Sequence, residues 1–135
     1  MKLEDLNATK ASSTPFEFEY IDHQGNPTGI FFTVLGGESE EVKAETCRLQ
    51  NERRQRAAAR AVSQKIGVGA KKSEFDRYED DVEYGRRIAA SRLVGWRGID
   101  DEFSPENALR LCKNNDHIAA TITAQSEAME NFIKL

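Results

Sequence analysis

The fold is decided by residues 16–35, which read FEFEYIDHQGNPTGIFFTVL. Apolar and acidic residues alternate strictly over 16–20, and such alternation predicts a half-buried strand. Residues 22–27 are dense in turn formers, and 30–35 read as a second strand. The stretch therefore predicts a β-hairpin. Because two strands alone are marginally stable in water, the hairpin must pack against something else.

Helical signals dominate the chain after Gly36-Gly37. Ser39 can cap a helix that runs to about Ile66, and the acids that follow it suit the positive end of the helix dipole. The apolar face of this helix changes direction near Arg53, so the helix either breaks there or meets different neighbours along its length.

A second long helix is predicted to begin with the cap at Ser73 and to end at the glycines that flank Trp96. One side of it carries an apolar stripe: Phe75, Tyr78, Val82, Ala89 and Leu93. Ser104-Pro105 predicts the start of a short helix that stops at Asn114-Asn115, and Asp116 is expected to cap a final helix.

These elements predict an α+β fold of 135 residues in which an N-terminal β-hairpin precedes about four α-helices. A chain of this length fits one domain. We expect residues 1–14 to form a flexible arm and 15–135 a single, mostly helical domain, with the hairpin at 16–35 and the helical region at 39–135.

Charge is unevenly spread along the chain. The net charge is −4, yet residues 48–72 hold eight cations and one acid, a local +7. Arg53, Arg56 and Arg60 form one row on the first long helix. Three readings stay open for this row: a solvated face, a docking face for an acidic protein, or a nucleic-acid surface. The absence of aromatic residues from 48–70 argues against base stacking.

No group of residues predicts catalysis, a cofactor or a metal site. The soft metal ligands His23, Cys47, Cys112 and His117 lack the close spacing of a structural zinc site. Neither cysteine belongs to a nucleophile motif, and the glycines at 67 and 69 lack the spacing of a phosphate-binding loop. The acid pair Asp80-Asp81 reads as a solvated surface. We therefore expect a protein that is not an enzyme.

Two widely spaced cysteines are expected to stay reduced, as in a cytoplasmic protein. No apolar run reaches the length of a membrane span, and the N-terminus lacks the apolar core of a signal peptide. Trp96, between Gly95 and Gly98, is either an anchor for a partner or a core plug beneath the last two helices.

Several motifs together carry a family resemblance. They are the turn at 22–29, VLGGES at 34–39, the arginine-rich helix, LVGWRGI at 93–99, FSPENA at 103–108 and ENFI at 130–133. In this order they resemble the tail assembly chaperones of long-tailed, non-contractile phages. The likeness spans residues 16–135.

The resemblance implies a non-enzymatic protein that binds the tape measure protein and helps tail tube subunits polymerise around it. It also implies a place in the host cell cytoplasm, absence from the mature virion and, in many family members, a longer form made by ribosomal frameshifting. The shifting apolar face and the unpartnered hairpin indicate self-association. On this reading Arg53, Arg56, Arg60 and Trp96 are the candidate partner-binding residues. The alternative is a small nucleic-acid-binding or regulatory protein that uses the basic segment 48–72.

Overall fold

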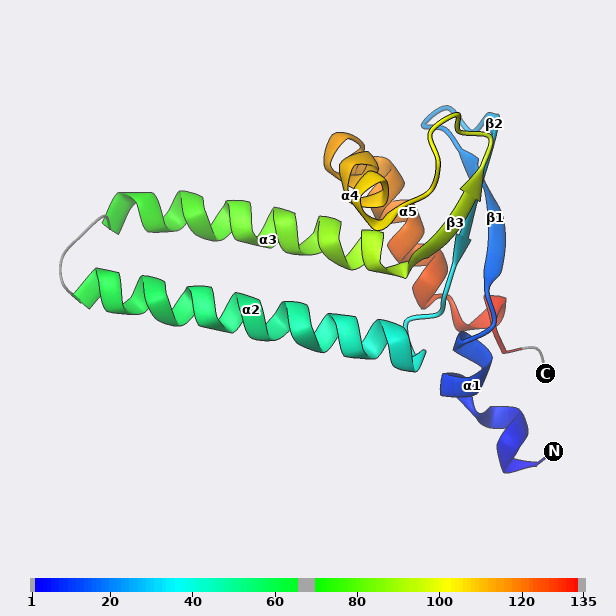
Figure 1. The fold of residues 1–135 in the computed structure, drawn as a ribbon, viewed down its shortest axis with the longest axis horizontal. Helices are drawn as coiled ribbons and strands as arrows, with labels where there is room; N and C mark the ends of the chain where they lie inside the picture. The colour runs from blue at the N-terminus through cyan, green and yellow to red at the C-terminus, as the bar shows by residue number, and fades with distance from the viewer. Residues whose placement is uncertain (1, 66–69, 134–135) are drawn as a thin grey trace.

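A three-stranded antiparallel sheet forms one end of the molecule (Figure 1). The computed structural model describes residues 2–65 and 70–133. Strands β1 (Phe16–Ile21) and β2 (Pro27–Val34) form the predicted hairpin. Its turn is held by Asp22, whose Oδ1 accepts hydrogen bonds from the backbone N–H groups of Gln24 and Asn26, both at 2.9 Å. The hairpin predicted from residues 16–35 is thus confirmed.

The third strand, β3 (Leu93–Arg97), was not predicted. The second long helix was predicted to run to the glycines that flank Trp96, but it ends at Arg92, and Leu93 and Trp96 lie in β3. β3 pairs with β2 so that Phe32 lies opposite Trp96, and a register shift between Thr33 and Val34 leaves Val94 outside the regular pairing. The hairpin leaves one edge of β2 unpaired, and β3 pairs with that edge. Because β2 and β3 lie far apart in the sequence, no local pattern at 93–97 predicts this strand.

The core lies between the inner face of the sheet and the helices α4 (Pro105–Asn114) and α5 (Asp116–Glu127). Phe32 and Val34 of β2 are fully buried there, as are Cys112 and Ile122 of the helices. The predicted start of α4 is confirmed, because Ser104 Oγ accepts a hydrogen bond from Asn107 N at 3.1 Å. α5 begins at Asp116, but Asn115 is its N-cap residue and no side chain caps the helix, so the cap predicted at Asp116 was wrong. The helix ends at Glu127 and is followed by the 3₁₀ turn η2 (Met129–Asn131).

A helical arm projects from this body (Figure 1). It consists of the antiparallel helices α2 (Glu40–Lys65) and α3 (Ala70–Arg92). Ser39 caps α2 as predicted, since its Oγ accepts a hydrogen bond from Val42 N at 3.2 Å. α2 is continuous through Arg53, so the break that the sequence offered as one alternative is not observed. The predicted end of the first long helix at Ile66 and the glycines at 67 and 69 lie outside the described residues. The second long helix, α3, begins at Ala70, three residues before the cap predicted at Ser73.

The N-terminal segment 1–14, which the sequence predicted to be flexible, contains two helical turns, η1 (Leu3–Leu6) and α1 (Ala8–Ser12). Ser12 is fully buried, and its carbonyl oxygen accepts a hydrogen bond from Gly36 N at 2.9 Å. A Cβ atom at position 36 would lie 2.5 Å from the Ser12 Cβ, so glycine is required for this approach. The N-terminal turns are therefore joined to the end of β2.

The observed architecture is α+β with a predominantly helical chain, as the sequence predicted. Of the helices that the structure describes, none combines the length and the apolar character needed to cross a membrane.

Candidate partner-binding surfaces

The predicted arginine row lies on the side of α2 that faces α3. Arg60 Nη2 is 2.6 Å from Asp80 Oδ2, and Arg56 Nε is 3.3 Å from Asp80 Oδ1. Arg53 forms an ion pair with Asp81. The spacing of three and four residues aims these side chains at one neighbouring helix. The acid pair that the sequence assigned to a solvated surface is therefore the counter-charge of the arginine row.

Burial increases along the row toward the end of α2. The side chains of Arg53 and Arg56 are 41% and 40% exposed, whereas that of Arg60 is only 18% exposed. Arg54, one position from Arg53, is exposed on a different face of the helix. Within the described part of the chain, Arg56 Nε and Arg60 Nη1 are buried and lack a hydrogen-bond partner. Arg56 Nε still has the Asp80 carboxylate at 3.3 Å as its ion-pair partner, so Arg60 Nη1 is the buried donor that bears the cost of a missing hydrogen bond.

A cavity of about 360 Å³ opens beside these arginines, between the two helices. It is lined by Asp81 of α3 and by four residues of α2: Arg53, Ala57, Arg60 and Ala61. Both alanines are exposed. The Arg53 guanidinium also lies over the Tyr84 ring, 4.8 Å from the ring centroid. In this stretch, ion pairs and the contact between Arg53 and Tyr84 join the two helices.

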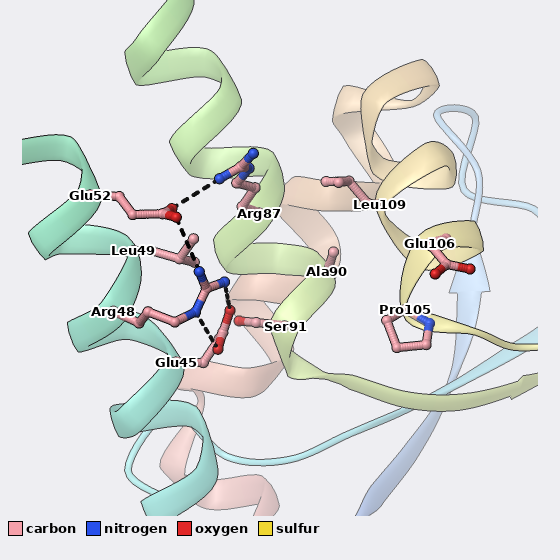
Figure 2. A pocket seen from close by; sticks show the side chains of 10 residues that line it. All are labelled: Glu45, Arg48, Leu49, Glu52, Arg87, Ala90, Ser91, Pro105, Glu106 and Leu109. Atoms are coloured by element: carbon pink, nitrogen blue, oxygen red, sulfur yellow. Dashed lines mark hydrogen bonds and ion pairs between the residues drawn. The ribbon is translucent and has the colours of Figure 1, made fainter. Parts of the chain in front are cut away.

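A second recess lies between the arm and α4 and is shown in Figure 2. It has a volume of about 410 Å³, and its apolar lining comes from Leu49 of α2, Ala90 of α3, and Pro105 and Leu109 of α4. Its wall on α2 is a chain of ion pairs that runs from Glu45 through Arg48 and Glu52 to Arg87 of α3. This recess could not be predicted from the sequence, because its residues come from three helices that are separated along the chain.

The charges in this wall affect one another. The Arg48 guanidinium donates two hydrogen bonds to the Glu45 carboxylate and, with Arg87 nearby, holds the pKa of Glu45 below its usual value, although partial burial opposes the shift. The same contact raises the pKa of Arg48. Both groups are therefore charged at neutral pH, and the wall of the recess stays ionic.

The apolar stripe predicted on α3 is only partly covered. Ala89 is fully buried, but Tyr78 is 65% exposed and Val82 is half-buried. A hollow of about 550 Å³ between α3 and α5 is lined by Val82, Gly85 and Ile88 on the α3 side. The stripe is therefore covered near Ala89, where α4 and α5 pack on α3, and is exposed farther along the arm at Tyr78.

Trp96 packs against the core and not into solvent. Its Nε1 donates a hydrogen bond to the Asp101 carbonyl at 2.9 Å, and its ring meets the Phe103 ring edge-on with 5.1 Å between centroids. This placement favours the core-plug alternative of the sequence analysis. A partner-binding role for Trp96, as for the three arginines, stays a prediction.

The two histidines, far apart in sequence, come together in space. Their ring centroids are 4.0 Å apart, and Tyr20 Oη lies 2.7 Å from His117 Nδ1. Cys47 and Cys112 are both free thiols, and burial raises the pKa of Cys112 to about 11. Among the described residues, no three metal-ligating side chains gather in a group that could hold an ion.

Comparisons with known proteins return no match to this chain, whether with protein-family models, with curated proteins or with solved structures.

Proposed function

We propose that this chain is a tail assembly chaperone of a long-tailed phage, which binds the tape measure protein and promotes assembly of the tail tube around it. The motifs between residues 16 and 135 that resemble this family support the proposal. In this role the protein carries out no catalysis, acts in the host cell cytoplasm and leaves before the virion is complete.

The observation that carries the proposal is the helical arm. α2 and α3 extend past the body, and the outer half of α2 bears exposed residues such as Val62. A helix with so little apolar burial of its own has most of its surface available to a partner. An extended helical client such as a tape measure protein can lie along an arm of this kind.

The alternative of a nucleic-acid-binding protein receives less support. Arg53, Arg56 and Arg60 face the carboxylates of Asp80 and Asp81, so they are not displayed as a row toward a phosphate backbone. The net charge of −4 also opposes non-specific binding to nucleic acid.

The test is co-expression of this protein with the tape measure protein of the same phage, followed by a pull-down and a solubility assay. We expect the tape measure protein to become soluble and to co-purify. If it stays insoluble and unbound, also with a longer frameshifted form of the chaperone, the proposal is wrong. Salt-sensitive retention on DNA would then favour the nucleic-acid alternative.

A further inference from the structure

The apolar stripe of α3 comes to the surface along the arm, on the side of the helix away from α2. Tyr78 is 65% exposed, Val82 is half-buried and Gly85 is exposed. Their spacing of four and three residues places them on one side of the helix. Asp80 reaches α2 from the opposite side. The spacing continues to the buried Ala89, so the stripe has the period of a coiled-coil seam whose outer end lies at the surface.

A projecting ring and an open space follow each other along this stripe. The Tyr78 side chain stands at the surface of the arm. Gly85 has no side chain, and a Cβ atom at this position would have nothing within 4 Å. Gly85 also lines the hollow of about 550 Å³ between α3 and α5, where α5 contributes small side chains such as Ala120 and Thr123. The same surface therefore carries a knob and a hole for an aromatic ring.

We propose that a second copy of this chain packs across the stripe in the antiparallel sense, so that Tyr78 of each copy enters the hollow beside Gly85 of the other. A two-fold axis near Val82 relates the two halves of this contact. Each copy then offers the same patch, as in an isologous dimer. The inference goes beyond the proposed function and does not depend on it.

The charges beside the stripe fit the same arrangement. Glu79 is exposed and has no ion-pair partner among the described residues. Arg86 pairs with Asp116, a side chain that is itself 77% exposed. Glu79 and Arg86 are seven residues apart and so share one position of the repeat, next to the seam. In an antiparallel pair Glu79 of one copy lies opposite Arg86 of the other, and the two charges attract.

A parallel pair of arms fits these observations less well. It would set Tyr78 against Tyr78 and leave the space at Gly85 empty. Only the antiparallel sense brings the ring of one copy to the hollow of the other, and it does so twice in one interface.

The first experiment measures the mass of the intact protein by sedimentation equilibrium, from micromolar to near-millimolar concentration. We expect a reversible dimer. Tyr78→Ala should raise the dissociation constant of the dimer about tenfold or more, as expected when a buried aromatic anchor is truncated. Val62→Ala is the matched control, since Val62 is a 59% exposed apolar residue on the other helix of the arm. It should leave the dissociation constant unaltered.

Gly85→Gln tests the hole. The monomer has room for this side chain, because a Cβ at position 85 meets nothing within 4 Å, and glutamine favours a helix more than glycine does. The variant should therefore melt at or above the wild-type temperature in dilute solution. It should nevertheless weaken the dimer about tenfold or more, since it fills the space that the tyrosine ring enters.

A mixing experiment tests the orientation. Glu79→Arg leaves only cations at the two flanking positions and Arg86→Glu leaves only acids, so each variant repels its own copy. Each alone should dimerise several-fold more weakly than the wild type. An equimolar mixture restores opposite charges at both contacts and should dimerise at least as tightly as the wild type. A fold defect in either variant would not be repaired by mixing.

Three results would overturn the inference. They are a monomeric mass at every concentration, equal losses for Tyr78→Ala and Val62→Ala, and a mixture of the charge variants that dimerises no better than each variant alone. These assays contain no tape measure protein. Their failure therefore leaves the chaperone proposal standing, and failure of the co-expression test leaves the dimer to be judged by its own mass.

Discussion

Tyr20 Oη lies 2.7 Å from His117 Nδ1 and so joins β1 to the first turn of α5. The two residues are 97 positions apart in the chain. Tyr20 is buried, and the His117 ring in turn lies against that of His23 from the hairpin turn. This contact fixes the outer end of the hairpin to the helical layer.

Tyr20→Phe should therefore lower the free energy of unfolding by about 1 kcal/mol, because it removes one partly buried hydrogen bond while keeping the ring. Urea denaturation followed by circular dichroism measures the change. Tyr78→Phe is the matched control, since that ring is 65% exposed, and it should leave the midpoint unaltered. Equal stability of Tyr20→Phe and the wild type would show that the hydroxyl contributes nothing.

Substitution by alanine should have opposite effects on stability at Gly36 and at Gly85. Gly36→Ala would place a Cβ 2.5 Å from the Ser12 Cβ and should destabilise the fold by about 1–3 kcal/mol, as overpacking does. Gly85→Ala adds a methyl group to α3 with nothing within 4 Å, so it should stabilise by up to about 1 kcal/mol through helix propensity. Thermal melts of both variants test the pair, and a stable Gly36→Ala would contradict the observed docking of the N-terminal turns.

Salt should loosen the arm before it affects the core. Residues 53–62 of α2 depend on ion pairs with α3, and these are screened when the Debye length falls to ~3 Å at about 1 M salt. α5 packs through buried apolar residues such as Ile122 and serves as the internal control. Hydrogen exchange measured by mass spectrometry should show faster exchange in 53–62 at high salt, with little change in 116–127. Uniform acceleration in both segments would argue against a separately held arm.

The Glu45–Arg48 contact predicts a specific pH dependence. The hydrogen bonds and charge of Arg48 lower the pKa of Glu45 in the folded protein, so the contact contributes stability above the ordinary carboxyl pKa of 4.5. That contribution is lost as the pH falls through the lower, folded-state pKa. Arg48→Gln should move the pKa of Glu45 up toward 4.5 in a ¹³C NMR titration of the carboxyl carbon. Arg110→Gln, an exposed charge on α4, should leave that titration in place.

Features set by neighbours in the chain could be predicted from the sequence. The alternation at 16–20 and the turn at 22–27 predicted the hairpin, because a strand's period and a turn's hydrogen bonds involve residues a few positions apart. The caps at Ser39 and Ser104 were predicted for the same reason, since each bonds an N–H three residues ahead. The α+β class followed from these local signals.

Only the tertiary structure decided the rest. Leu93–Arg97 became a strand because the edge of β2 supplies it with hydrogen-bond partners from far earlier in the chain. Asp80 became the counter-charge of Arg56 and Arg60 because α2 and α3 fold back on each other, which aligns charges that no local pattern relates. The sequence showed that Arg53, Arg56 and Arg60 lie on one side of α2. Whether that side faces solvent or another helix depended on the packing of α3 against α2.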